Sequence, residues 1–249
     1  LTDKDSRLMQ KRNRPPVVGY NVQTVVDEEH KLIVAYDITS NANDKTHLLP
    51  MVRKIVDGEE NITQEVVADS GYYNGEHILE VEKLGVKTYI PHVNTSSSKS
   101  NGRYDKEQFV YLSQQDAYQC PSGNILERSY REKAGSKRVF YKTPSCKQCH
   151  QRPACTRNKA GRVIYRNKYD AAVERMKKRN QDNPGAQKKR KALVEHPYGT
   201  LKHNWGYGHF LLKGKQKVNG EMGLMLLAYN MKRMMNIFGE AAVKKFVEI

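Results

Sequence analysis

The 249-residue sequence lacks the features of secreted and membrane proteins. No apolar run reaches the roughly 18 residues that a membrane-spanning helix needs, and no segment resembles a signal peptide. Cysteine is scarce, with four residues, and without a signal for secretion these thiols are not expected to form disulfides. The eight histidines include no His-x-x-x-His pair of the kind that zinc enzymes use. We therefore expect a soluble cytoplasmic protein without a membrane partner.

Acidic residues are scarce in one long segment. Between Glu127 and Val218 there are 25 lysines and arginines but only 6 aspartates and glutamates, and the rest of the chain is slightly acidic. The net charge of +16 therefore originates in this segment. Such a concentrated excess predicts a phosphate backbone as partner, because each neutralised phosphate releases counterions. The alternative is a solvated basic face.

The first 93 residues show the pattern of an α/β domain. Two segments rich in β-branched residues flank a polar turn, which is typical of a hairpin. The following apolar segments alternate between helical spacing and short strands. The expected elements are strands at Val17–Asp27 and Lys31–Thr39, a helix ending near Val56, a strand at Glu65–Asp69, a helix at Gly75–Leu84 and a strand at Val86–Ile90.

This order of elements is typical of a ribonuclease H-like fold, a mixed sheet flanked by helices. That fold has one more antiparallel strand before the hairpin, and we do not find this strand in the sequence. It also has a helix after the last strand, expected near Lys188–Lys202. Because the chain starts at Leu1 with a polar segment, we expect it to be a fragment.

Changes in pattern divide the chain into three expected parts. Residues 1–93 form the first part of the ribonuclease H-like core. Residues 94–184 begin with a Ser-rich linker and form a basic insertion that contains all four cysteines. Residues 185–249 return to the core and include a strongly apolar helix at Glu221–Ile237.

Two carboxylates are candidates for a metal site. Asp69 follows a buried strand and precedes a glycine turn, where open α/β sheets bind ligands. Glu195 is a lone acid on the expected helix, and one interpretation of it is a surface salt bridge. The other is a magnesium ligand shared with Asp69, with the neighbouring cations held for phosphates. These cations are Lys188, Lys189, Arg190 and Lys191.

The four cysteines form a candidate structural zinc site. They are Cys120, Cys146, Cys149 and Cys155. Cys146 and Cys149 make a C-x-x-C turn, and Cys120 begins a glycine-turned loop, so both segments can present thiolates to tetrahedral zinc. His150 is an alternative ligand, and four free reduced cysteines are the alternative interpretation.

A set of short motifs extends through nearly the whole chain. They are Ala68-Asp-Ser-Gly-Tyr-Tyr73, Cys120-Pro-Ser-Gly123, Val194-Glu-His-Pro-Tyr-Gly199 and Leu226-Leu-Ala-Tyr-Asn-Met-Lys-Arg233. In this order they resemble the DDE transposases of bacterial insertion sequences. The resemblance implies a ribonuclease H-like core with an insertion before the last catalytic helix. It also implies strand cleavage and joining at element ends, dependent on Mg²⁺ or Mn²⁺.

The resemblance assigns roles to single residues and to partners. Asp69 matches the family's second aspartate and Glu195 its glutamate, while Lys202 matches a lysine expected to contact DNA phosphate. At the family's tyrosine and arginine positions this sequence has Lys188 and Lys191 instead. The implied partners are double-stranded DNA, as transposon end and as target, and a second copy of the chain in a nucleoid-associated synaptic complex.

The family's first aspartate, usually within Asp-Gly-Thr, has no counterpart that we assign. Asp3 and Asp5 are not placed in that role. Asp27 is interpreted as a turn acid, and Asp44 as a helix cap, a position that Asn43 could also take. The fragment is therefore expected to lack one of three metal carboxylates. The alternatives to a transposase are a truncated, inactive DNA-binding protein with a zinc knuckle and a nuclease of the same fold.

Overall fold

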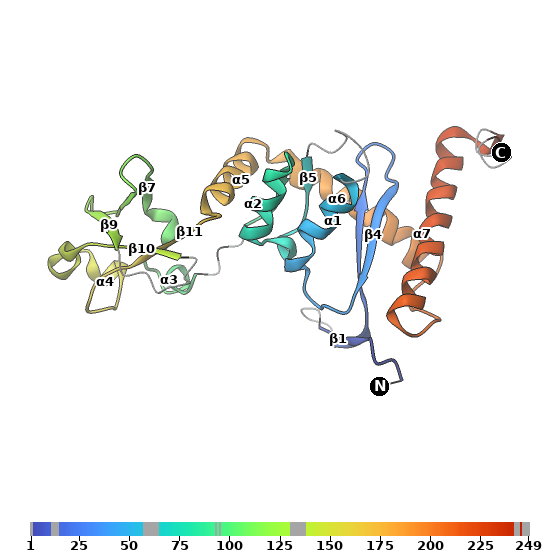
Figure 1. Cartoon of the computed structure of the whole chain (residues 1–249), viewed down its shortest axis with the longest axis horizontal. Coiled ribbons are helices and arrows are strands. Elements are labelled where there is room, and N and C mark those ends of the chain that lie inside the picture. The colour runs from blue at the N-terminus through green and yellow to red at the C-terminus, as the bar shows by residue number, and fades with distance from the viewer. Residues whose placement is uncertain are drawn as a thin grey trace. The chain divides into compact units, whose positions relative to one another are not determined.

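The structure is a computed structural model that describes residues 2–10, 15–56, 65–92, 94, 96–129, 138–241 and 245. For residues 97, 99, 189, 191, 192, 194 and 195 it describes the backbone alone. The chain divides into two compact units, one made of residues 1–91 and 172–249 and the other of residues 92–171. Both units contain helices and strands (Figure 1). The protein is a mixed α/β protein.

The first unit begins with antiparallel strands. The predicted hairpin is confirmed as β3 (Asn21–Val26) and β4 (Ile33–Thr39), with Val22 opposite Ile38. The hairpin is preceded by a short ladder, which the sequence did not predict, between β1 (Arg7–Met9) and β2 (Val17–Gly19). Alternate residues of β3 face opposite sides, so Asn21 and Gln23 lie on the side opposite to Val22.

A second strand pair is parallel. β5 (Glu65–Val67) pairs with β6 (Lys87–Tyr89), and α2 (Gly75–Lys83) connects them, capped by Asn74. These elements and α1 (Leu48–Val56) confirm the predicted order. Within the described residues, however, the two strand pairs are not hydrogen-bonded to one another, so the single continuous sheet that we expected is not formed.

The hairpin lies between two helices of the first unit (Figure 1). α1 packs on one side of it, and α7 (Lys215–Phe238) packs on the other. The core on the α7 side is apolar except for its tyrosine hydroxyl groups. Burial of this apolar surface stabilises the packing of α7 on the hairpin. Its buried members are Ile33, Ile38, Leu201, Val218, Met222, Leu226 and Tyr229.

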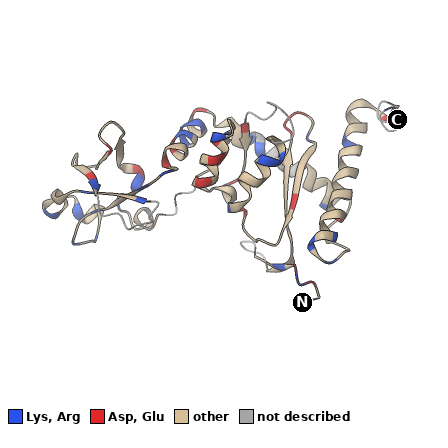
Figure 2. Ribbon diagram, viewed as in Figure 1, with Lys and Arg blue, Asp and Glu red and all other residues tan. Residues whose placement is uncertain are grey.

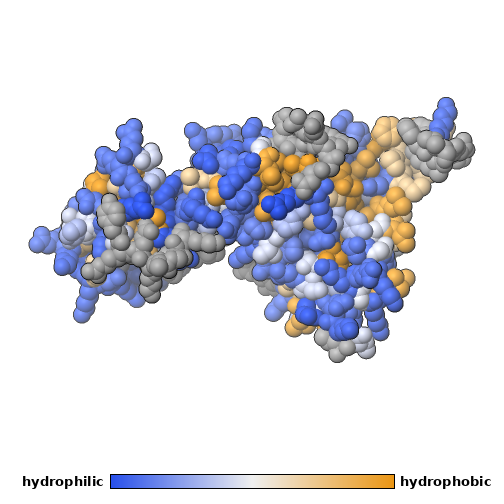
Figure 3. Space-filling view, in the orientation of Figure 1, coloured by the Kyte–Doolittle hydropathy of each residue, from blue (hydrophilic) through white to orange (hydrophobic). Residues whose placement is uncertain are grey.

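α7 has a second, exposed apolar face. Leu224 is 70 % exposed and Leu227 is 55 % exposed, so only one face of this helix packs in the core. Figure 3 shows hydrophobic residues along this helix. No helix of the described chain is long and apolar enough to cross a membrane.

Three consecutive helical segments precede α7 in the chain. α5 (Asp170–Asp182) and α6 (Gly185–Gly199) are followed by a π-helical turn, η5 (Thr200–Asn204), so the helix predicted at 188–202 is confirmed. Near the start of α6, the Gln187 side chain donates a hydrogen bond to the Tyr89 carbonyl at the end of β6. Near its end, the Tyr198 hydroxyl donates to the Val22 carbonyl of β3. α6 therefore contacts both pairs.

The second unit contains a five-stranded antiparallel sheet. Tyrosines dominate its core, and the partly exposed Asp116 carboxylate accepts hydrogen bonds from Tyr111 and Tyr141. The sequence did not predict this sheet. Its strands, neighbours in chain order, are β7 (Val110–Leu112), β8 (Ala117–Gln119), β9 (Ile125–Ser129), β10 (Arg138–Lys142) and β11 (Ile164–Asn167).

Candidate functional site

Asp69 lies at the carboxyl end of β5, as predicted. It is the N-cap of the turn η2 (Ser70–Tyr72), and its Oδ1 accepts a hydrogen bond from the Gly71 amide at 2.7 Å. An N-cap carboxylate is held at a point where free backbone N–H groups favour negative charge. The Asp69 side chain is only partly buried.

Asp44 has a different role from the one predicted. The turn η1 (Asp44–Thr46) is capped by Asn43, whose side chain accepts from the Lys45 amide. Asp44 is therefore not the cap. Its Oδ1 accepts hydrogen bonds from the side-chain amides of Asn21 and Gln23, both at 2.7 Å. The cap position was predicted from local sequence, whereas this contact depends on the packing of η1 against β3.

The carboxylates of Asp44 and Asp69 meet at Gly71. A Cβ atom at Gly71 would lie 2.9 Å from Asp69 Oδ1 and 3.1 Å from Asp44 Oδ2. The absence of a side chain therefore leaves space that both carboxylates border. Within the described residues, no lysine, arginine or histidine forms an ion pair with either of them. Two neighbouring carboxylates without a cation repel each other.

A hydrogen-bonded network supports Asp44 from behind. Gln23 is 1 % exposed, donates to Asp44 and accepts a hydrogen bond from the Tyr72 hydroxyl. Burial raises the pKa of Tyr72, and the charges of Asp44 and Asp69 and the Tyr198 phenol raise it further. Tyr72 therefore stays protonated and remains a donor. This fixes the orientation of the Gln23 amide and directs its NH₂ group to Asp44.

Tyr198 joins this network to α6. Its hydroxyl lies 3.1 Å from the Val22 carbonyl and 3.3 Å from Thr24 Oγ1, and burial raises its pKa. Glu195 precedes Tyr198 by three residues in α6, a spacing that places two positions on one face of a helix. The side chain of Glu195 lies outside the described residues, as do those of Lys189 and Lys191.

The other predicted DNA-contacting residues are described. Lys188 and Lys202 are exposed, and Arg190 is partly buried. The Lys202 ammonium lies 5.4 Å from the centroid of the Tyr198 ring, a cation–π contact. Lys and Arg residues occur along α5 and α6 in Figure 2. Of the predicted DNA-contacting side chains that the structure describes, Lys188 and Arg190 therefore belong to α6 and Lys202 to η5.

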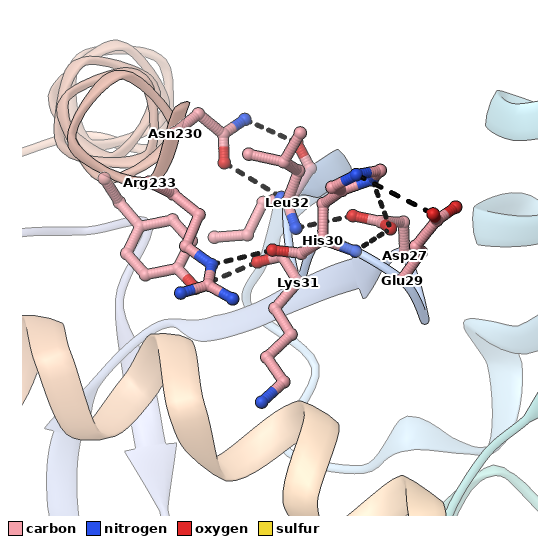
Figure 4. Close-up of polar contacts among 9 residues, drawn as sticks. Asp27, Glu29, His30, Lys31, Leu32, Asn230 and Arg233 are labelled. Atoms are coloured by element: carbon pink, nitrogen blue, oxygen red, sulfur yellow. Dashed lines mark hydrogen bonds and ion pairs between the residues drawn. The ribbon is translucent and has the colours of Figure 1, made fainter. Parts of the chain in front are cut away.

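α7 clamps the turn of the β3–β4 hairpin through side chains (Figure 4). Asn230 Oδ1 accepts from the Ile33 amide at 2.9 Å, and its NH₂ group donates to the Ile33 carbonyl at 2.8 Å. Arg233 Nε donates to the His30 carbonyl at 2.7 Å. Inside the turn, Asp27 accepts from the amides of His30 and Leu32, which confirms it as a turn acid. The Asn230 side chain therefore satisfies both backbone groups of Ile33, as the backbone of a neighbouring strand would.

Asn230→Ala is expected to lower the free energy of unfolding by about 2 kcal/mol, because two backbone groups of the buried Ile33 lose their partners. Urea denaturation measures this loss. Asn236→Ala, at an exposed position of the same helix, is the matched control and is expected to change stability by less than about 0.5 kcal/mol. Equal losses in both variants would contradict the clamp.

His196 connects α6 to the same clamp. Its Nδ1 lies 3.0 Å from the Tyr229 hydroxyl, which also donates to the Lys31 carbonyl. Burial lowers the pKa of His196, and the positive charges of Arg233 and Lys31 lower it further. The residue adjacent to Glu195 is thus a neutral imidazole that is fixed to α7.

This lowered pKa predicts a pH dependence of stability. The unfolded chain binds a proton at His196 more readily than the folded chain, so the stabilisation is complete above about pH 6.5 and is lost as the pH falls below it. His196→Gln is expected to reduce the slope of unfolding free energy between pH 7 and 5, by at most about 1.4 kcal/mol per pH unit. Replacing the exposed His203 by Gln should leave the slope unchanged, and an unchanged slope in both variants contradicts the assignment.

Asp3 and Asp5 act as structural residues. Asp3 Oδ2 accepts from the Gly214 amide at 3.0 Å and from the Tyr20 hydroxyl at 2.8 Å. Asp5 Oδ2 accepts from the Lys215 amide at 3.0 Å. The Gly214 bond is the main reason that the pKa of Asp3 is lowered. Both acids satisfy free amides at the start of α7, where a helix lacks its own acceptors.

The four cysteines gather in the second unit. Cys120, Cys146, Cys149 and Cys155 are all reduced, partly buried and in the lining of one cavity of about 20 Å³. Burial raises the pKa of the Cys155 thiol, and the three other thiols act in the same direction. The backbone at Gly161 passes close to Cys146, since a Cβ atom on Gly161 would lie 2.6 Å from the Cys146 Cβ.

The donor set of this cavity fits a single soft cation. Four thiols in a space too small for an organic ligand match the preference of zinc for sulfur. Among the described residues, no three His, Cys, Asp or Glu side chains already stand at metal-binding distances. Ligation therefore requires the thiols to move together, which their partial exposure permits.

A comparison with known protein families gave a match for the region from β8 to α7. Residues 119–235 match the model of the family described as transposase DDE domain. This match supports a DDE transposase. The match includes the cysteines, Glu195 and Lys202, and it leaves Asp69 outside. Searches of curated proteins and of solved structures gave no match.

Some residues of this candidate site were not found from the sequence. Asn21, Gln23 and Tyr72 hold Asp44 beside Asp69, and none of them was a candidate. One signal was present: two amides at alternate positions of a strand point to the same side, where a polar partner is required. The partner itself could not be named without the tertiary fold.

Proposed function

We propose that this chain is the catalytic part of an insertion-sequence transposase that cleaves DNA at element ends and transfers the strand. In this proposal Asp69 and Glu195 hold Mg²⁺ or Mn²⁺. The metal would polarise the phosphodiester and activate water or a 3′-hydroxyl as nucleophile. The observation that carries the proposal is that the Asp69 turn and α6 both bond to β3, Tyr72 donating to Gln23 and Tyr198 to the Val22 carbonyl.

This connection matters because the two proposed ligands are far apart in sequence. Asp69 caps η2, whose Tyr72 donates to Gln23 of β3, and Tyr198 of α6 donates to the carbonyl of the preceding residue of that strand, Val22. Residue 195 lies about one helical turn before Tyr198, on the same face. The turn of the strand-end aspartate and the helix that contains residue 195 thus both bond to β3, in keeping with a ribonuclease H-like core.

The two separate strand pairs also agree with this core. In a ribonuclease H-like sheet, one more strand pairs with the first strand of the hairpin and with the strand that carries Asp69. Here β3 and β5 correspond to those two strands, and in the described residues neither pairs with the other. We propose that the family's first aspartate belongs to such an additional strand.

The cations of α6 and η5 would bind the DNA backbone. Exposed Lys188 and Lys202 stand at the two ends of this helical stretch, and Lys189, Arg190 and Lys191 lie between them. Each contact with a phosphate releases counterions, so binding is expected to weaken steeply with salt. Tyr207 and Phe210 pack against the core on the α7 side, and the Tyr207 hydroxyl donates to Glu221, so these aromatics have a structural role.

The cysteine cavity would hold a structural zinc within an insertion that stiffens the DNA-binding region. Transposon ends are brought together in pairs, so we propose a homodimer in a nucleoid-associated synaptic complex. An inactive DNA-binding protein and a hydrolytic nuclease are the competing functions. No observation in the structure favours either of them.

A cleavage assay tests the proposal. The protein expressed from the whole reading frame is incubated with DNA that carries the ends flanking its gene, with Mg²⁺ and a labelled target. Nicks at the element ends together with joined products are expected. Cleavage without joining indicates the nuclease, and metal-independent binding without cleavage indicates the inactive DNA-binding protein.

A further inference from the structure

We propose that Asp44 is a further carboxylate of the metal site that contains Asp69. The proposal rests on the proposed function of Asp69 and adds a residue to it. Its basis is the approach of Asp44 Oδ2 and Asp69 Oδ1 to the same point beside Gly71, where a Cβ atom would lie 3.1 Å and 2.9 Å from them.

The need for this space, and not the backbone conformation, accounts for a glycine at position 71. Its φ lies outside the left-handed region that favours glycine, so an alanine would suit the backbone. An alanine Cβ, however, would come within 3.0 Å of a carboxylate oxygen, closer than such atoms normally approach. The glycine thus keeps the space between two acids open.

The carboxylate of Asp44 is held for a ligand. Asn21 and Gln23 both donate to Oδ1 at 2.7 Å. Within the described residues, no hydrogen bond is made by Oδ2, the oxygen that faces Gly71. One oxygen therefore anchors the side chain and leaves the other available. The buried Gln23 is itself fixed by the Tyr72 hydroxyl, so the support extends into the core.

A divalent cation is the ligand whose chemistry fits best. Among the described residues neither carboxylate is paired with a lysine or arginine. Two such carboxylates raise each other's energy, and a cation between them removes this repulsion. Magnesium binds through one or two carboxylates and completes its shell with water and substrate oxygens. Two acids are therefore enough to bind it weakly, and Glu195 would strengthen the site.

Mn²⁺ binding to the purified chain tests the assignment without an activity assay. Bound Mn²⁺ is counted by electron paramagnetic resonance, with the protein first loaded with Zn²⁺ so that the thiols are occupied. Asp44→Asn keeps an oxygen that accepts from Asn21 and Gln23, and it removes the charge. It is expected to weaken Mn²⁺ binding by about tenfold or more. Asp182→Asn, at an exposed position of α5, is the control and is expected to bind like the wild type.

Gly71→Ala provides a second variant that keeps both carboxylates. Its Cβ would fill the space between them, so a loss of Mn²⁺ affinity of about tenfold is expected here too. Thermal unfolding in EDTA checks both folds. If Asp44→Asn does not fold, Gly71→Ala decides alone, and wild-type affinity in Gly71→Ala then overturns the proposal.

The outcomes separate this proposal from the proposed function. Weaker binding in both Asp44→Asn and Asp69→Asn supports a shared site. Weaker binding in Asp69→Asn alone overturns the role of Asp44 and leaves the proposed function intact. Unchanged binding in both, or no Mn²⁺ site in the wild type, overturns both assignments.

Discussion

Replacing Asp69 by asparagine is expected to lower the rate of metal-dependent DNA strand cleavage by roughly 100- to 1000-fold. A catalytic metal supplies several kcal/mol of transition-state stabilisation, and losing about 3 to 4 kcal/mol corresponds to this factor. Asparagine retains the oxygen that accepts from the Gly71 amide, so the turn after β5 is kept. The measurement is the single-turnover rate of nicking at an element end.

Asp182→Asn is the control for this experiment, because it removes one negative charge from an exposed position of the same unit. It is expected to cleave at the wild-type rate. DNA binding is measured in parallel, and Asp69→Asn should bind as well as the wild type or slightly more tightly. A variant that lacks Asp69 and still cleaves normally would remove Asp69 from the catalytic site.

Removing zinc is expected to destabilise the second unit. A metal present at about 100 times its dissociation constant stabilises the folded state by about 2.7 kcal/mol. For a unit of this size, that corresponds to a shift in Tm of roughly 10–20 °C. Hydrogen exchange of the intact chain measures the effect locally. After chelation, peptides from β8 to β10 should lose protection, while peptides from β3 and β4 should not.

Cys149→Ser is the matching substitution, since serine preserves the size of the side chain and removes the thiolate. The variant is expected to contain less than one zinc per chain. Without any chelator, its peptides from β8 to β10 should show the same loss of hydrogen-exchange protection as the chelated wild type. Ser122→Ala, beside Cys149, is the control and should retain the metal. Zinc-free wild-type protein with full protection in the second unit contradicts a structural zinc.

Much of the first unit could be predicted because its signals are local. Alternation in the hairpin, the caps and stops around α2, and the strand that ends at Asp69 are all visible in short windows of sequence. The role of Glu195 needed the resemblance to a family, since a lone acid in a basic helix equally suggests a salt bridge. Local pattern alone could not choose between these interpretations.

The remaining features depend on contacts between distant residues. Asp44 looked like a helix cap because its neighbours have turn composition, but its partners are two amides on β3. The sheet of the second unit has strands of three to five residues, too short for a periodic signal. Its tyrosines and Asp116 hold the strands together only after folding.

Iron-mediated backbone cleavage tests the metal site most directly. Fe²⁺ replaces Mg²⁺ in the zinc-loaded chain, and peroxide with ascorbate then generates hydroxyl radicals that cut the chain near the bound ion. Cuts are expected at the Asp69 turn, at η1 with Asp44 and in α6 around Glu195, and excess Mg²⁺ should suppress them. Cuts elsewhere only, or cuts at these places that Mg²⁺ does not suppress, would contradict a metal site formed by Asp69 and Glu195.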